Sequence, residues 1–329
     1  MLNMTSKSFE SNCFQDFLES LPKEIFWESF DIYQWKGFWF HPSILQSTIA
    51  LSTKFVPRDD DIILASSLKV GTTWLKALCL SINNGADQEN EDILTKGSPH
   101  LFVPTIESMV FVPNSDSVLS GMASPRLLHT HLPYSLLPDS IKNSGCKIVY
   151  LTRNPKDTFI SFWHYFNSTK VDTCGTERPL VIGIKQQISL EKAFESFCNG
   201  TYLYGPIFDH ALEYHKESSK MPQKILFMKY EELKKDPKGQ LKKLASFLGK
   251  PFTEEEKVDK ILWRCSLERL KNLEVNKNGV NPWNWLANSS YFRLGVTGDS
   301  KNYLTAEMEE RLDQIARTKL EASGLDLDA

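Results

Sequence analysis

The chain has 329 residues, of which 41% are hydrophobic and 24% charged, a balance that is typical of globular proteins and excludes disorder throughout. The 38 basic and 41 acidic residues leave a formal net charge of −3, which argues against a general nucleic-acid binder. No segment is long and apolar enough to span a membrane, so we expect neither a nucleic acid nor a membrane as a partner.

The N-terminal segment, MLNMTSKSFESN, is polar and lacks the apolar core of a signal peptide. The six cysteines are scattered without a C-x-x-C pair, which favours reduced thiols in a cytoplasmic protein and gives no support for a zinc site. We expect a single domain over residues 1–329, in which residues 1–30 form a partly flexible extension. The oligomeric state is left open.

The first clear strand is Asp61–Ser66, and a helix with one apolar face is expected over Thr72–Ile82. The loop between them, within SSLKVGTTW, contains Gly71, which allows the backbone to approach a ligand closely. The amides from Gly71 to Trp74 would be free N–H groups of a helix N-terminus, and Lys69 adds a positive charge, so the loop predicts an anion site. Because the lysine precedes the glycine, the pattern G-x-x-x-x-G-K-[ST] is absent. An ordinary strand–turn–helix with a stray lysine is the alternative.

A candidate base lies in the segment Pro125–Pro138, PRLLHTHLPYSLLP, where His131 ends a short apolar run beside prolines. A hydroxyl nucleophile needs a base for its proton, and histidine titrates near neutral pH. A structural histidine is the alternative. Two histidines so close on a strand also suggest a metal, but no further ligand pattern follows, so we expect no metal.

The second clear strand is Lys147–Thr152, and Asn154-Pro155 then supplies an N-cap and a proline at the first helical position. The helix is expected over about Lys156–Phe166. Arg153 closes the strand, and arginine is suited to bidentate capture of a phosphate, with a surface ion pair to Asp157 as the alternative.

The following stretch, Ser168–Ile188, has no steady period and is the best candidate for a long loop, either a lid or a disordered segment. A third strand is expected over Lys224–Met228. Signals of helix ends then follow at Asp236-Pro237 (start), Gly249 (end), the capping box Thr253-x-x-Glu256 (start) and Thr305 (start).

This alternation of strands and helices predicts an α/β fold with a central parallel β-sheet flanked by helices on both faces. Ligands in such folds bind beyond the carboxyl ends of the strands. Here those ends lead to Lys69, Arg153 and Tyr230.

Four motifs resemble those of the cytosolic sulfotransferase family, its plant branch in particular. They are K-x-G-T-T-W-L after the first strand, T-H-x-P-x-x-x-L-P, R-[ND]-x-K-D with a serine eight residues after the arginine, and YFRLGVTGDSKNY (291–303), which is similar to F-R-K-G-x-x-G-D-W-K. The resemblance covers roughly Trp35 to the end of the chain. It implies a P-loop-like sulfotransferase fold and a sulfuryl donor, 3′-phosphoadenosine 5′-phosphosulfate (PAPS).

In that family the loop lysine contacts the phosphosulfate and the tryptophan stacks on adenine, so these roles are implied for Lys69 and Trp74. The 3′-phosphate would be held by Arg153 and Ser161, and the catalytic base would be His131. The full set of donor-binding residues implied by the resemblance is Lys69, Val70, Gly71, Thr72, Thr73, Trp74, Arg153, Ser161, Tyr204, Cys265, Ser266, Leu267, Arg293, Leu294 and Gly295.

Within this set, Tyr204 is implied to contact adenine, and Cys265 and Leu267 to line the adenine pocket. His129 stands where many members have a lysine or a small residue, and we expect its ring to point to the opposite face of the strand from His131. We expect the acceptor pocket to be walled by Thr105, Ile106, Tyr134 and Tyr165.

The chain departs from the family motifs at four positions. Leu68 and Val70 replace a proline and a serine or threonine, so Val70 removes one hydroxyl from the phosphate loop. Leu294 replaces a lysine and Ser300 a tryptophan. A lysine–phosphate contact contributes roughly 1.5–3 kcal/mol, so its loss corresponds to about ten- to a hundredfold in affinity unless a residue such as Lys301 compensates.

The resemblance implies an enzyme that moves a sulfuryl group from PAPS to a hydroxyl of a small-molecule acceptor of the flavonoid, steroid, hydroxyjasmonate or desulfoglucosinolate class. Adenosine 3′,5′-bisphosphate (PAP) would leave, Lys69 would stabilise its charge, and no metal would be required. Two alternatives stand beside it. A nucleotide kinase is disfavoured by the missing G-K-[ST], whereas a catalytically weakened homologue that binds a nucleotide or small molecule is kept open by the four departures.

Overall fold

The computed structural model describes residues 6–85, 92–109, 115–168 and 184–327. Its central sheet has four parallel strands in the order β5-β4-β6-β7. The strands are β4 (Ile62–Ser66), β5 (Leu127–Thr130), β6 (Lys147–Thr152) and β7 (Ile225–Lys229). The parallel sheet and three of its strands are confirmed, and the fourth, β5, is the short apolar run before His131.

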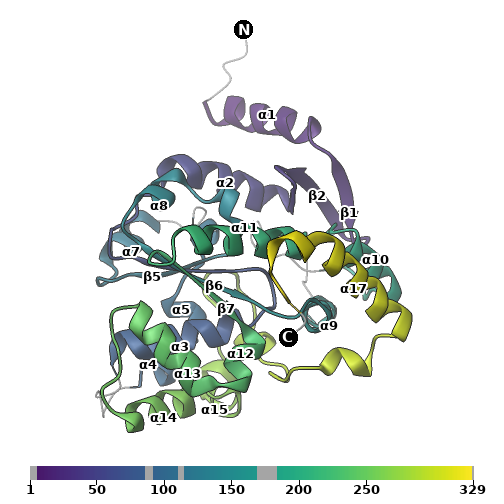
Figure 1. Cartoon of the computed structure of the whole chain (residues 1–329). Helices are drawn as coiled ribbons and strands as arrows, with labels where there is room; N and C mark the ends of the chain where they lie inside the picture. The colour runs from purple at the N-terminus through teal and green to yellow at the C-terminus, as the bar shows by residue number, and fades with distance from the viewer. Residues whose placement is uncertain (1–5, 86–91, 110–114, 169–183, 328–329) are drawn as a thin grey trace.

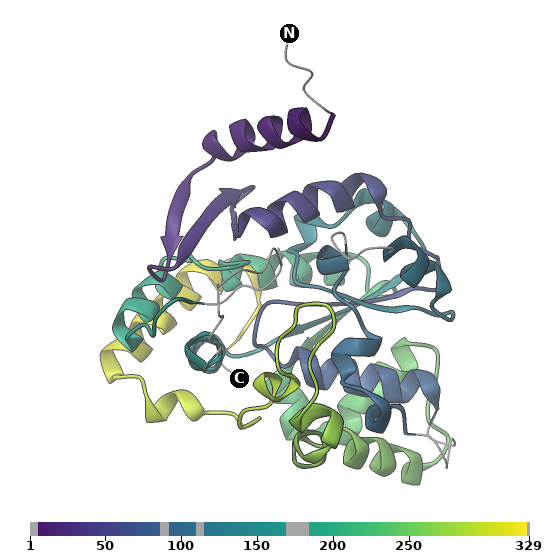
Figure 2. The same cartoon turned by 180° about the vertical axis from the view of Figure 1, so that it is seen from behind.

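Both faces of this sheet are buried, because alternate side chains of each strand enter separate clusters. Ile63 and Ala65 of β4 pack into one cluster, and Ile62 and Leu64 into the other. Helices α2 (Pro42–Lys54), α9 (Pro155–Ser168), α11 (Ile207–Lys220) and α17 (Ala306–Leu320) contribute to the first cluster. Helices α3 (Thr72–Asn84), α13 (Pro237–Phe247) and α14 (Glu255–Arg264) contribute to the second. Figures 1 and 2 show α2 and α11 on one side of the strands and α3 and α13 on the other, which confirms the predicted layers.

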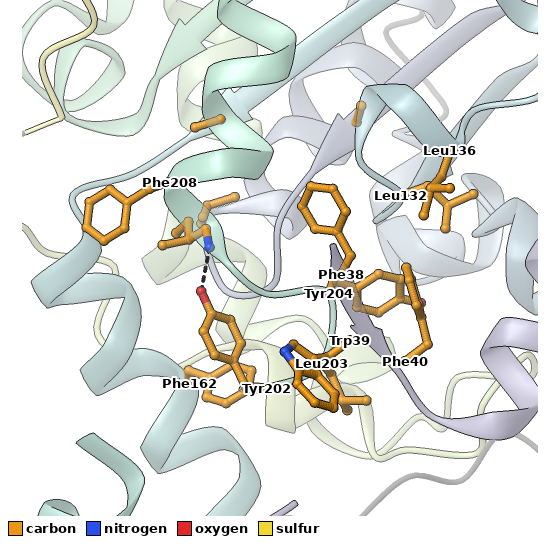
Figure 3. Close-up of a cluster of buried hydrophobic side chains, with 14 of the residues drawn as sticks. Phe38, Trp39, Phe40, Leu132, Leu136, Phe162, Tyr202, Leu203, Tyr204 and Phe208 are labelled. Carbon is orange, nitrogen blue, oxygen red and sulfur yellow. Dashed lines mark hydrogen bonds between the residues drawn. The ribbon is translucent and has the colours of Figure 1, made fainter. Parts of the chain in front are cut away.

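A second, antiparallel sheet near the N-terminus was not predicted. It follows α1 (Ser6–Glu19) and consists of β1 (Lys23–Phe26), β2 (Phe30–Trp35) and β3 (Phe38–Phe40). Its last strand is joined to a distant segment, since Trp39 N donates to Gly205 O (3.2 Å) and Tyr204 N donates to Trp39 O (2.8 Å). Figure 3 shows the aromatic side chains of β3 beside Leu203 and Tyr204.

Part of the N-terminal segment packs against the main core. Phe26 and Trp27 are buried in the larger core cluster, and both rings pack edge-on against Phe162 of α9. The partly flexible extension over residues 1–30 stays a prediction.

Helix boundaries agree with the sequence signals at most sites. Asn154 caps α9 through its side chain, which accepts from Lys156 N at 2.9 Å, and Asp236 caps α13 in the same way. Thr305 caps α17. The capping box at Thr253 was wrong, because α14 begins at Glu255 with Glu254 at its N-cap and no side-chain cap bond. Most of the long loop expected over 168–188 falls on residues 169–183, outside the described residues.

The remaining helices are short and connect these layers. Over the described ranges, every helix is too short or too polar to cross a membrane. The five described cysteines are free thiols, and Cys174 lies outside the described residues. The short helices are α4 (Ile93–Lys96), α5 (Pro99–Phe102), α6 (Ile106–Met109), α7 (Ser115–Gly121), α8 (Asp139–Asn143), α10 (Leu190–Cys198), α12 (Tyr230–Lys235), α15 (Leu267–Asn272) and α16 (Glu274–Lys277).

Candidate active site

A cavity of about 470 Å³ lies at the carboxyl ends of the parallel strands. It is lined by residues that follow each strand of the central sheet: Lys69 after β4, His131 after β5, Arg153 after β6 and Tyr230 after β7. This is the position at which the α/β pattern predicts a ligand.

The cavity is strongly cationic. Five of its lining side chains are lysines or arginines, and its described lining contains no aspartate or glutamate. The five are Lys69, Lys76, Arg153, Lys234 and Arg293. A ligand with several negative charges therefore fits this cavity, although the chain as a whole is slightly acidic.

The loop between β4 and α3 contains two residues with left-handed backbone conformations. Lys69 and Gly71 both have positive φ angles, of 65° and 107°. A Cβ atom on Gly71 would lie 2.7 Å from the Tyr230 ring, so a side chain at this position would collide with it. The amide of Trp74 donates to Gly71 O at 3.0 Å, so it is not one of the free donors that we expected.

Lys69 and its neighbour Val70 face opposite ways. The Lys69 Nζ lies in the cavity, 4.0 Å from the centroid of the Tyr165 ring. Burial, followed by the charges of Arg293 and Arg153, lowers the pKa of Lys69 to about 7. Val70 is fully buried in the core and is not among the described residues that line the cavity, so its side chain does not face a donor there, and its place in the donor-binding set stays a prediction.

Both threonine hydroxyls of the loop are hydrogen-bonded to other side chains. Thr72 Oγ1 lies 2.7 Å from Ser66 Oγ, which in turn lies 3.1 Å from His129 Nε2. Thr73 Oγ1 lies 2.9 Å from His100 Nε2. Each loop hydroxyl is thus backed by a buried histidine, an arrangement that no sequence motif indicated.

The ring of His131 is fixed by the strand beside it. Its Nδ1 lies 2.8 Å from the carbonyl oxygen of Ser66. Since a carbonyl only accepts, Nδ1 carries the proton, and Nε2 of the neutral ring keeps its lone pair. Burial lowers the pKa of His131 to about 3, although the bond to Ser66 opposes this shift, so the ring is neutral at pH 7. The cationic cavity is thus lined by a neutral imidazole with one unprotonated nitrogen.

His129 was expected to point away from His131, and this was wrong. The two residues are two positions apart, so their side chains lie on the same side of the chain, and the ring centroids are 4.3 Å apart. His129 is fully buried between the hydroxyls of Ser66 and Thr105, at 3.1 and 3.0 Å, and does not line the cavity. It supports the cavity wall from behind.

Arg153 and Asp157 join α9 to the loop before α17. The Arg153 guanidinium donates to Val296 O (2.7 Å) and to Asp157 Oδ2 (3.2 Å). The same Asp157 carboxylate accepts from the amides of Gly298 (2.7 Å) and Ser300 (3.0 Å). The predicted ion pair with Asp157 therefore exists alongside the predicted cavity position of Arg153, whose buried Nε has no hydrogen-bond partner among the described residues.

The C-terminal loop brings Arg293, Leu294 and Gly295 to the cavity, as predicted. Arg293 is oriented by Asp299, with 2.6 Å between Nη1 and Oδ2. Leu294 is 48% exposed and supplies no charge. Lys301 is exposed and is not one of the described lining residues, so it does not replace the missing lysine.

Trp74 and Tyr204, both expected to contact adenine, have different neighbours in the cavity. Trp74 lines the cavity, and its ring contacts Tyr230 edge-on at 5.6 Å. Tyr204 instead contacts His131, at 5.4 Å between ring centroids, and its hydroxyl lies 3.4 Å from Glu107. The contacts therefore place Tyr204 at the histidine end, and Tyr230 is the tyrosine beside Trp74.

The other predicted positions divide between cavity and core. Ser161, Cys265, Ser266 and Leu267 all line the cavity, as expected. Of the four expected acceptor-wall residues, only two line it: Thr105 and Tyr165 do, whereas Ile106 and Tyr134 do not. Lining residues that the motifs missed include Lys76, His100, Trp283 and Tyr291.

The described residues contain no group of three or more side chains suited to hold a metal ion. The groups that line the cavity include the neutral imidazole of His131, three lysines and two arginines, a set that fits a polyanion.

Comparisons with known proteins agree with this chemistry. A family model described as a sulfotransferase domain matches residues 59–324. Cytosolic sulfotransferase 5 of Arabidopsis thaliana is 41% identical over 317 residues, which cover 94% of each chain. Cytosolic sulfotransferase 7 of the same plant is 42% identical and covers 94% of this chain and 93% of its own.

Solved structures give the same result. A crystal structure of an Arabidopsis thaliana sulphotransferase is similar with a TM-score of 0.74 and 34% identity over 99% of both chains. Mouse sulfotransferase SULT7A1, complexed with PAP, has a TM-score of 0.67 and 26% identity, covering 89% of this chain and 95% of its own.

Proposed function

This chain belongs to the sulfotransferase family, and we propose that it transfers a sulfuryl group from PAPS to a hydroxyl of a small-molecule acceptor, with His131 as the general base. The acceptor is proposed to be of the flavonoid, steroid, hydroxyjasmonate or desulfoglucosinolate class. The names of its plant relatives support a cytosolic site of action.

The observation that carries the proposal is the hydrogen bond from His131 Nδ1 to Ser66 O, because it leaves Nε2 free to accept a proton. In the proposed step Nε2 takes the acceptor's hydroxyl proton while the oxygen attacks sulfur. The bond between sulfur and the bridging phosphate oxygen breaks, and its electron pair stays on PAP. Catalysis by positioning and electrostatics suffices for such a transfer.

The donor's charges match the cationic side chains. We assign Lys69 to the 5′-phosphosulfate and Arg153, Ser161 and Arg293 to the 3′-phosphate. The adenine base is assigned to Trp74 and Tyr230, with Tyr204 moved to the acceptor side, because Tyr204 contacts His131.

The test is transfer of radiolabelled sulfate from PAPS to a panel of hydroxylated small molecules by wild type and His131→Asn. Asparagine keeps an N–H donor near Ser66 O but has no basic nitrogen. We expect kcat to fall about 10²–10⁴-fold, the usual contribution of a positioned general base. The Kd of PAP should change less than about twofold, because the other side chains hold the donor.

Near wild-type kcat in a folded His131→Asn variant would refute the assignment of the base. Tight binding of PAP without transfer to any acceptor would instead favour a nucleotide-binding relative that has lost activity. No binding of PAP would refute the proposed donor.

A further inference from the structure

We propose that Lys76 and His100 are positioning residues that fix the direction of the Thr73 hydroxyl, so that its proton points into the cavity toward the 5′-phosphate of the donor. This inference rests on the proposed function. It concerns two buried residues that the reaction scheme above does not use.

The three side chains form a continuous hydrogen-bonded chain. Lys76 Nζ, almost fully buried in α3, donates to Val103 O at 2.9 Å and lies 3.2 Å from His100 Nδ1. His100 Nε2 lies 2.9 Å from Thr73 Oγ1. The cavity is lined by all three residues.

The charge of Lys76 gives this chain a direction. An ammonium group only donates, so His100 Nδ1 must accept. A neutral imidazole then carries its single proton on Nε2 and donates it to Thr73 Oγ1. The Thr73 oxygen is thereby used as an acceptor, and its own proton is left to donate elsewhere.

Among the described residues, His129, the other histidine near the loop, is not hydrogen-bonded to a charged group that would fix its proton. His129 lies between the hydroxyls of Thr105 and Ser66, and either hydroxyl can donate or accept. The direction of that chain is not fixed by its contacts. Lys76 is therefore what distinguishes the Thr73 side of the loop from the Thr72 side.

The His100 ring is also held in place from its face. It stacks on Tyr291 with centroids 4.0 Å apart and ring planes inclined by 23°, and its backbone carbonyl accepts from Trp283 Nε1 at 3.0 Å. A donor held in this way needs little reorganisation when negative charge builds up on the leaving phosphate. The buried chain thus orients one hydroxyl for binding and for the transition state.

The first test is a double-mutant cycle on the full chain, read as the Kd of PAP by calorimetry. Thr73→Val removes the hydroxyl, and we expect Kd to rise about ten- to a hundredfold. His100→Phe keeps the ring against Tyr291 and removes both nitrogens. It should raise Kd about three- to tenfold in wild type, but less than about twofold in the Thr73→Val background.

A rescue variant shows whether PAP binding depends on the hydrogen bond to Thr73 or only on the size of the side chain at position 100. His100→Gln keeps an N–H donor within reach of Thr73, so its Kd should stay within about twofold of wild type. The proposal would be overturned if the two increases in Kd multiplied in the double variant. It would also be overturned if His100→Gln bound PAP as weakly as His100→Phe. Thermal unfolding of each variant shows which proteins are folded.

The second test reads the direction itself, by ¹⁵N NMR of the histidine rings in the free protein. Burial lowers the pKa of Lys76 to about 7, so spectra recorded near pH 6 report the charged lysine. We expect His100 to carry its proton on Nε2 and His131 on Nδ1. A proton on Nδ1 of His100 would overturn the proposal even if no variant folds. The NMR measurement needs no ligand. If wild type failed to bind PAP, the proposed function would be refuted, and the position of the His100 proton would still decide this proposal.

Discussion

Two loops face the same cavity and are held in different ways. The loop of residues 66–74 continues directly from β4 into α3, and its Ser66, Ser67 and Val70 are buried. The loop of residues 293–300 is exposed at Leu294 and Val296 and is attached to the sheet side mainly through Arg153 and Asp157. The first is fixed by the core and the second by a few polar side chains.

The four departures from the family motifs fall in these two loops, two in each. In the first loop, Val70 is buried and is not among the described residues that line the cavity, while Lys69 and Gly71 on either side of it have positive φ angles. In the second, Ser300 needs only its backbone amide to bond with Asp157, so the loss of a tryptophan leaves the attachment intact. Leu294, by contrast, removes a charge that faces the cavity.

The largest expected effect comes from the first loop. Lys69→Ala should lower kcat about 10²–10³-fold, because the charge facing the leaving phosphate is lost. The measurement is single-turnover transfer at saturating PAPS. Near wild-type turnover would contradict the role of Lys69.

A pH measurement sharpens this prediction. In the protein without a ligand, burial and two arginines lower the pKa of Lys69 to about 7, so the Lys69 side chain is largely uncharged above this pH. A bound phosphate favours the charged form and raises that pKa, so PAP binding near pH 8 should take up protons. Calorimetry in buffers of different ionisation enthalpy measures the uptake, which Lys69→Met should reduce. Equal uptake in both proteins would assign the titration elsewhere.

An intermediate effect is expected where the second loop is attached. Asp157→Asn keeps the shape but removes the charge and turns an amide group toward the donors of Arg153 and Gly298. We expect the Kd of PAP to rise about tenfold. Asp139→Asn, a change in a carboxylate that is 88% exposed, is the matched control and should leave Kd unchanged. Equal affinity in Asp157→Asn and wild type would show that the loop is held by other contacts.

Features set by local sequence were predictable, whereas contacts made by packing between distant segments were not. The strands, the anion loop, Arg153 and the C-terminal motif were predicted because local patterns and motif spacing specify them. Two hydrogen-bonded series of side chains were not predicted, because each joins residues that are brought together only by packing. One runs from Lys76 through His100 to Thr73, and the other from Thr105 through His129 to Ser66. The same limit applies to the contact between Tyr204 and His131, since Tyr204 is held by backbone pairing with Trp39 of the unpredicted N-terminal sheet.

The smallest expected effect tests the missing lysine. Leu294→Lys adds a charge to the second loop at a cavity-lining position that is 48% exposed, so solvent should weaken the new contact. We expect the Kd of PAP to fall about three- to tenfold, with a smaller gain for AMP, which lacks the 3′-phosphate. Added salt should reduce the gain.

Val296→Lys is the matched control, because Val296 belongs to the same loop, is 44% exposed and is not among the described lining residues. If a positive charge anywhere on this loop attracts the nucleotide, both variants will bind PAP more tightly by the same factor. The affinity for PAP will then increase no more than the affinity for AMP. If Leu294 marks a lost phosphate contact, only Leu294→Lys will discriminate between the two nucleotides. The second result would show that the weaker attachment of this loop still holds its residues at the 3′-phosphate, with one charge removed.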